Sequence, residues 1–105
     1  MTTATMKWTD PTTRVDGTAL APAEIASIDI FDSAASNPAV PIGNVPGGTG
    51  TFTTGALSVG DHTFSFVVND TTGHKSASAA ASPVTVPATL ANPSPVSAIT
   101  VTLNP

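Results

Sequence analysis

The chain has 105 residues, of which 10% are charged and 40% are hydrophobic, and its formal net charge is −4. This length suits one domain, so we expect a single core. Its only basic residues are Lys7, Arg14 and Lys75, too few for the positive patch that holds phosphates, and nucleic acid is excluded as an expected partner. No apolar run approaches the ~20 residues that cross a bilayer, so no membrane partner is predicted.

The first predicted strand lies near the start of the chain, where Ala4, Met6 and Trp8 alternate with polar residues. Alternation with a period of two is typical of a half-buried strand. We therefore expect Met6 and Trp8 on the buried face, with Trp8 in the core. Pro11 ends this strand because proline cannot donate to a ladder, and a long polar connection over residues 9–24 follows.

Three short strands are predicted next along the chain. Residues 25–31 form the first, with Ile28 and Ile30 pointing inward. A short edge segment is expected around residues 40–42, because the three prolines over residues 37–46 confine it to an edge. The third covers residues 51–54.

The longest alternating run covers residues 62–69, between Gly60 and Gly73. One face of this run carries His62, Phe64, Phe66 and Val68. It predicts the central strand, followed by a hairpin-like loop and a strand over residues 77–86 that pairs back. No window combines helical spacing with a capping signature, so no helix is predicted.

The end of the chain has a different pattern. Residues 87–95 contain three prolines and predict a stiff linker. The apolar residues after it are Val96, Ile99, Val101 and Leu103, which predict an extra β-segment over residues 96–103. This segment either returns to its own sheet edge or adds to a neighbouring subunit. The expected organisation is thus a domain over residues 1–87, then a linker and β-segment over residues 88–105.

No catalytic, cofactor or metal site is predicted. The chain has no cysteine, which excludes disulfides and thiolate metal sites. Neither His62 nor His74 is accompanied by residues at metal-ligand spacing. We therefore expect His62 to be a structural corner and His74 to be a solvent-facing loop residue. Four carboxylates are expected in loops: Asp10, Asp16, Asp61 and Asp70. Calcium could bind such oxygen ligands, but hydrogen bonds that shape the turns are the favoured role. No nucleophile stands in an elbow motif or beside a base.

Several short motifs together resemble one family. They are residues 8–11 (WTDP), 16–20 (DGTAL), 28–31 (IDIF), Leu57 three residues before Gly60, and 69–76 (NDTTGHKS). Over residues 4–87 the chain resembles a fibronectin type III domain, in the variety common in bacterial and bacteriophage proteins. The resemblance implies an all-β, immunoglobulin-like antiparallel β-sandwich, here with an extra C-terminal strand after a proline-rich linker.

One position departs from the family pattern. The family usually has a tyrosine at the start of the central strand, and its hydroxyl ties back to the preceding loop. His62 stands at that position here. An imidazole nitrogen can make a similar bond, so we expect His62 to serve as the corner.

The resemblance, the low charge and the detached terminal segment favour a non-enzymatic structural or interaction protein. The expected role is a bacteriophage virion protein, such as a capsid decoration or accessory protein. Residues 1–8 lack the pattern of a signal peptide, as expected for a protein released by lysis. The alternative is an adhesive or carbohydrate-binding accessory module of a bacterial surface or secreted protein.

The expected partner is the major capsid protein or another virion protein, with a homo-oligomer through the terminal segment as a further possibility. Phe31 lies on the outward register of its strand, where it caps the core edge or contacts a partner. The predicted partner-binding residues are Arg14, Val15, Phe31, Val96, Ile99, Val101 and Leu103.

Overall fold

The computed structural model describes residues 2–88 and 93–104. Within these ranges the chain is nearly all β, which confirms the predicted class, and its only helical element is one 3₁₀ turn, η1 (Pro22–Glu24). The strands are β1 (Thr5–Lys7), β2 (Ile25–Asp32), β3 (Gly43–Pro46), β4 (Thr51–Thr53), β5 (Gly60–His62), β6 (Phe64–Asp70), β7 (Ala79–Ala80) and β8 (Val84–Val86).

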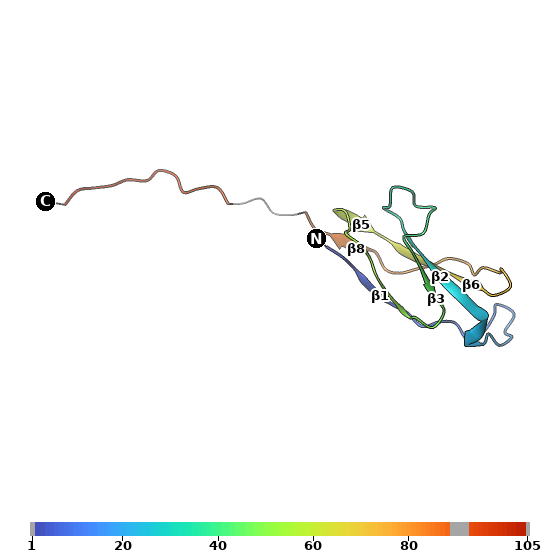
Figure 1. The fold of residues 1–105 in the computed structure, drawn as a ribbon. Coiled ribbons are helices and arrows are strands. Elements are labelled where there is room, and N and C mark those ends of the chain that lie inside the picture. Colours follow the sequence, from blue (N-terminus) through green and yellow to red (C-terminus); the bar gives the residue numbers. More distant parts are fainter. Residues whose placement is uncertain (1, 89–92, 105) are drawn as a thin grey trace.

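The strands form one larger sheet and two pairs, all antiparallel (Figure 1). The larger sheet has the order β3-β2-β6-β7, and β1-β4 and β5-β8 form the pairs. β6 has a neighbour on both sides, as predicted for the central strand. Its register on β2 places Phe66 opposite Ile30.

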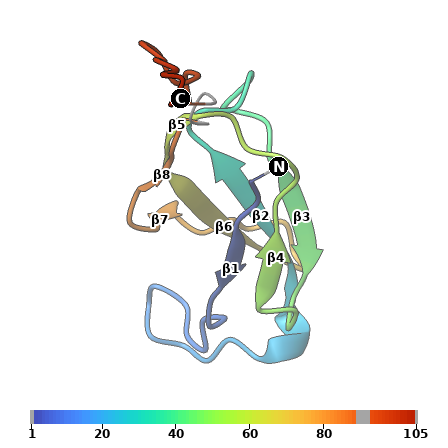
Figure 2. The same ribbon diagram turned by 90° about the vertical axis from the view of Figure 1, so that its left-hand side faces the viewer.

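The core lies between the four-stranded sheet and the β1-β4 pair (Figure 2). Ile28 and Ile30, expected inward, are 1% and 0% exposed. Trp8 is half-buried and packs against the core cluster, with its ring centroid 5.4 Å from that of Phe66. The core is therefore well closed around β2 and less closed around β1.

Three predicted boundaries are wrong. The edge strand lies at Gly43–Pro46 and not around residues 40–42, because Pro41 interrupts the chain and the ladder to β2 starts at Ile42, whose N–H bonds the Ile30 carbonyl. The run over residues 62–69 breaks at Thr63, so that β5 pairs with β8 while β6 stays in the larger sheet. The return strand over residues 77–86 is likewise divided into β7 and β8, with Pro83 between them.

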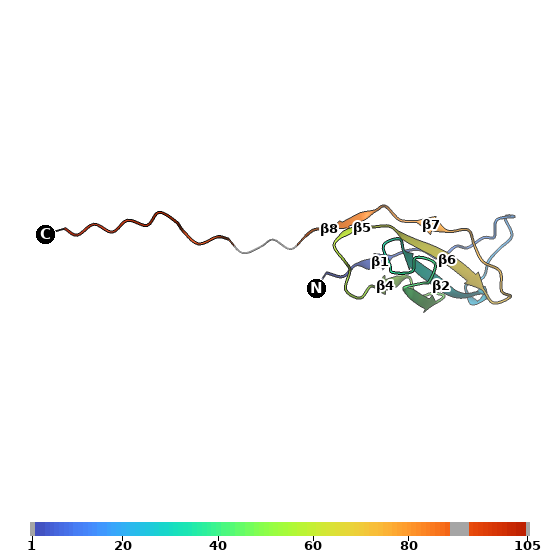
Figure 3. The same cartoon turned by 90° about the horizontal axis from the view of Figure 1, so that it is seen from above.

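The expected β-segment over residues 96–103 is not a strand in this structure. Residues 93–104, called the arm below, extend away from the sheets (Figures 1 and 3). Residues 89–92 of the predicted linker lie outside the described residues. A lone extended segment has no partner for its backbone groups and cannot form a ladder by itself. The prediction that the segment is strand-forming thus fails within this chain, and so does its return to the chain's own sheet edge.

The apolar side chains of the arm are exposed to solvent. Val96, Ile99, Val101 and Leu103 have exposed fractions between 74% and 91%. In the described part of the chain, no helix is long and apolar enough to span a membrane.

Candidate functional site

The long connection after β1 is an ordered loop. Gly17 has a φ of 85° and its N–H donates to the Arg14 carbonyl at 2.9 Å, so the chain turns here. Asp16 accepts bonds from the Thr18 hydroxyl at 2.7 Å and backbone N–H at 3.0 Å, and these bonds lower the pKa of the Asp16 carboxyl. Asp16 therefore shapes the turn, as aspartates in turns commonly do.

Arg14 ties this loop to the sheet. Its Nη1 donates to Oδ2 of Asp70 at 2.9 Å, and its Nη2 donates to Oε2 of Glu24 at the same distance. The Arg14 guanidinium holds the pKa of the buried Asp70 carboxyl well below its usual range, and backbone N–H groups of Thr72 and His74 add to this effect. Arg14, predicted as a partner-binding residue, thus makes two ion pairs within the chain. The ion pairs of Arg14 with Asp70 and Glu24 are called the bracket below.

The bracket leaves the next residue, Val15, fully exposed. Below it lies a groove of about 670 Å³ between the loop and the hairpin that follows β6. Its larger apolar residues are Val15, Leu20 and Val68, and the charged residues that line it are Arg14, Asp16, Asp70 and Lys75. This groove starts at Pro11, just beyond the end of β1.

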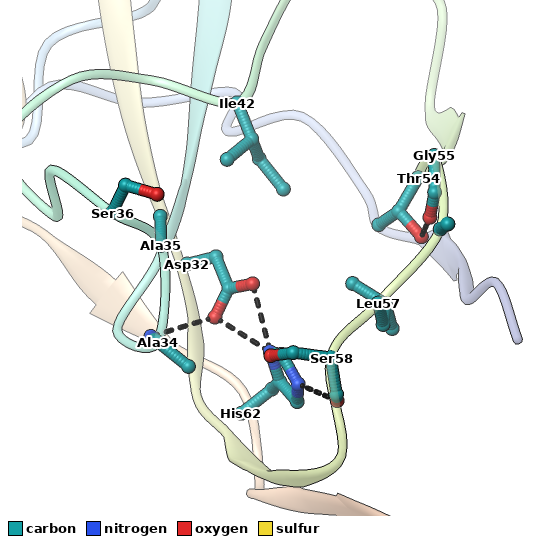
Figure 4. Close-up of a pocket in the computed structure, with 11 residues that line it drawn as sticks. Asp32, Ala34, Ala35, Ser36, Ile42, Thr54, Gly55, Leu57, Ser58 and His62 are labelled. Atoms are coloured by element: carbon teal, nitrogen blue, oxygen red, sulfur yellow. Dashed lines mark hydrogen bonds and ion pairs between the residues drawn. The ribbon is translucent and has the colours of Figure 1, made fainter.

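A second hollow, of about 320 Å³, lies beside His62 and Asp32 (Figure 4). The His62 Nδ1 is 2.8 Å from Oδ2 and 3.0 Å from Oδ1 of Asp32, and its Nε2 is 2.7 Å from the Ser58 carbonyl oxygen. Contacts of both ring nitrogens with oxygen atoms are satisfied when both nitrogens donate, as they do in the imidazolium. The hydrogen bond to the Ser58 carbonyl is the largest cause that raises the pKa of His62, and the hydrogen bond to Asp32 is the second.

This arrangement makes His62 a structural corner, as predicted. The bond to Ser58 reaches back to the loop before β5, as expected for an imidazole at this corner. With both nitrogens engaged and protonated, the imidazole has no lone pair with which to accept a proton from a nucleophile. His74, by contrast, has a largely exposed side chain, which confirms its predicted loop position.

The carboxylates do not converge on a cation site. Among the described residues, no cluster of His, Cys, Asp or Glu side chains could hold a metal ion. Asp10 accepts bonds from the Trp8 indole N–H and the Gly48 backbone N–H. Asp61 and Asp70 were expected in loops, but they lie in β5 and at the end of β6, because each strand extends to the residue that starts or ends the turn.

Phe31 is half-buried on the face of β2 that points away from the core. Asp29 on the same face accepts hydrogen bonds from the side-chain amides of Asn69 at 3.0 Å and Asn44 at 2.6 Å, and these bonds lower the pKa of Asp29. A satisfied polar network therefore covers much of this face beside Phe31.

The predicted partner-binding residues occupy three separate places. Arg14 and Val15 stand at the groove, Phe31 lies on the outer face of the sheet, and the remaining four residues belong to the arm. Sequence reasoning missed the groove and the bracket, because Arg14 and Asp70 are separated by 56 positions. The only available signal was the scarcity of basic residues, which makes any arginine in this chain notable.

Comparison of the chain with protein-family models, curated proteins and solved structures found no significant match. The features of the molecule that bear on its function are the arm, the groove and the incompletely closed core near β1.

Proposed function

We propose that this chain is a non-enzymatic structural protein of a bacteriophage virion, a capsid decoration or accessory protein that is held in the particle by protein–protein contacts. The observation that carries the proposal is the arm, whose four large aliphatic side chains are exposed. Exposed apolar side chains gathered in one segment mark an interaction site. An apolar segment whose backbone groups are unpaired also favours addition to a sheet edge of another chain.

The fold proposal behind this role is a fibronectin type III-like sandwich. Two features of the structure support it. His62 makes the corner bond to the loop before β5, and the β1-β4 pair packs against a four-stranded antiparallel sheet through Trp8 and Phe66. The virion role itself is supported by the resemblance to the bacterial and bacteriophage variety of this family.

The buried groups give no support to an enzymatic role. The imidazole of His62 is occupied at both nitrogens, and Asp70 is held ionised by Arg14. Neither group is free to exchange a proton with a substrate. The groups that the described residues offer, open sheet edges and exposed apolar side chains, are those with which a binding protein contacts its partner.

The test is to fractionate a lysate of the source culture by sedimentation and to follow the protein by mass spectrometry. We expect it to migrate with nucleic-acid-filled particles at a constant ratio to the major shell protein. Recovery with the cell wall or in soluble fractions, without a constant ratio to particles, overturns the proposal and favours the adhesive or carbohydrate-binding module.

A truncated chain ending at Pro87 locates the contact. The arm touches no described strand, so we expect the truncated domain to fold with an unchanged melting temperature and to be lost from the particles. If the truncated domain does not fold, the arm contributes to its own domain and cannot be the contact.

A further inference from the structure

The first of two unpartnered features in this chain is one edge of β1. β1 has β4 on one side and no described strand on the other. Thr54 N–H donates to the Ala4 carbonyl, and Trp8 N–H donates to the Gly50 carbonyl. Because hydrogen-bonding residues alternate in an antiparallel pair, the backbone groups of Thr5 and Lys7 point to the open edge.

The core beside this edge is incompletely covered. Met6 of β1 and Trp8, which directly follows β1, both point inward and are half-buried. Phe66 and Val68, the inward residues of the central strand, are also half-buried although they pack against the core cluster. One further strand beside β1 would extend the smaller layer over this part of the larger sheet.

The arm is the second unpartnered feature, and its pattern matches that edge. The chain bends at Ala98, whose φ is 55°. When the residues after this bend are extended, Ile99, Val101 and Leu103 lie on one face and Thr100 and Thr102 on the other. β1 has the same alternation, with apolar side chains inward and exposed Thr5 and Lys7 outward. A strand pairing that aligns these faces buries the aliphatic side chains and leaves a continuous row of polar ones.

We propose that the arm of one copy of this chain adds as a strand to the open edge of β1 in a second copy. The inference deepens the proposed function, resting only on its premise that the arm binds protein, and it names the partner. A second copy is favoured over the same chain because residues 93–104 run away from β1, and Pro93 and Pro95 favour continued extension over reversal (Figure 1).

The contact is heterologous, since the arm and the edge are different surfaces. Each copy still offers a free edge or a free arm after one contact has formed. Such contacts give closed rings when the rotation closes and open strings when it does not. The purified protein should therefore form oligomers larger than dimers as its concentration rises.

The first measurement is the concentration dependence of the molar mass of the purified chain by sedimentation equilibrium. Val101→Asp places a charge on the inward face of the arm, and Thr100→Asp places the same charge on the outward face. Both variants should fold, because the arm contacts no strand of its own domain. We expect wild type and Thr100→Asp to assemble, and Val101→Asp to remain monomeric with an apparent dissociation constant raised at least tenfold.

A second measurement identifies the edge. The chain has no native cysteine, so Lys7→Cys and Thr100→Cys can be prepared separately, mixed and treated with a short bis-maleimide. We expect a cross-linked pair that contains one chain of each kind. The control pairs Thr100→Cys with Ala39→Cys, which lies on the exposed loop before β3, and should give no cross-link.

Three results overturn the inference. A wild type that stays monomeric at every concentration shows that no second copy is bound. An internal cross-link in the Lys7→Cys/Thr100→Cys double variant, without linked pairs, places the arm on its own domain. Equal cross-linking to Ala39→Cys shows contact without a specific edge.

These results are separate from the test of the virion role. A monomeric protein that sediments with particles through its arm overturns the second copy as partner and keeps the proposed function. An oligomer that never accompanies particles keeps the pairing of arm and edge but removes the virion role.

Discussion

The Nδ1 atom of His62 lies 2.8 Å from Oδ2 and 3.0 Å from Oδ1 of Asp32, and both side chains are buried. The second ring nitrogen is 2.7 Å from the Ser58 carbonyl oxygen. The corner thus joins the end of β2, the end of β5 and the loop before β5 through one imidazolium. It is stronger than a neutral hydrogen bond because both partners of the Asp32 contact are charged.

The raised pKa of His62 predicts a fall in stability as pH rises. A group whose pKa is higher in the folded state stabilises the folded protein fully at a pH below its pKa in the unfolded chain, about 6.5 for histidine. This stabilisation is lost as the pH rises through the pKa of the folded state. We expect the urea midpoint to decrease as pH rises above about 6.5, because deprotonation of His62 then weakens the folded state.

The control is the exposed His74. His74→Ala should retain the pH dependence, and His62→Gln should flatten it. Should His62→Gln fail to fold, the NMR titration of the wild-type imidazole still decides the matter. A His62 resonance that titrates at or below the pH of a histidine in an unfolded chain contradicts the prediction.

Arg14→Gln should loosen the loop over residues 9–24 without unfolding the sheets. It removes both charge-assisted bonds that tie the loop to Asp70 and Glu24. We expect faster hydrogen exchange at the amide of Leu20, which donates to the Thr12 carbonyl within this loop. Lys75→Gln is the matched control, since its side chain is exposed and lies outside the bracket. Equal exchange in the two variants would show that Arg14 does not hold the loop.

Ile30→Ala and Ile99→Ala make the same chemical change in two environments. Ile30 is fully buried, so its truncation should cost roughly 2–5 kcal/mol of unfolding free energy. Ile99 is exposed in the arm, and its truncation should change this free energy by less than about 0.5 kcal/mol. Urea unfolding at a concentration where the wild type is monomeric compares the two. A comparable loss in both variants would place Ile99 in the core of its own domain.

Gly47→Ala should destabilise the junction of β2 and β3. A Cβ at Gly47 would meet the carbonyl oxygen of Ile25, a backbone atom that cannot move aside without disturbing β2. We expect a loss of about 1–3 kcal/mol, typical of an overpacked site. Gly55→Ala, where a Cβ meets nothing within 4 Å, should keep or slightly raise stability. Thermal unfolding of the pair measures the difference, and equal midpoints would be inconsistent with this packing.

The strands that the sequence predicts well are those whose alternation is local. Ile28 and Ile30 stand two residues apart and both are buried, and the central run forms β6 between two neighbours. The turn at Gly17 also follows from local chemistry, because a positive φ favours glycine. These features depend on residues that are close in the chain.

The features that the sequence did not predict depend on distant partners. The bracket of Arg14 with Asp70 and the pairing of β5 with β8 join residues far apart in sequence. For residues 96–103, in contrast, the sequence predicts a strand that the structure does not form. Their alternation favours a strand, but a strand also needs an edge, and the chain's own described edges are not brought to it.

All ten charged residues precede residue 76, so the arm carries no charged side chain. An association that depends on aliphatic burial and backbone bonds has little charge for salt to screen. Sodium chloride should leave it nearly unchanged, whereas sulfate should strengthen it and cooling should weaken it. Assembly through the arm should therefore depend on temperature more than on ionic strength. A preparation that dissociates in the cold should reassemble on warming.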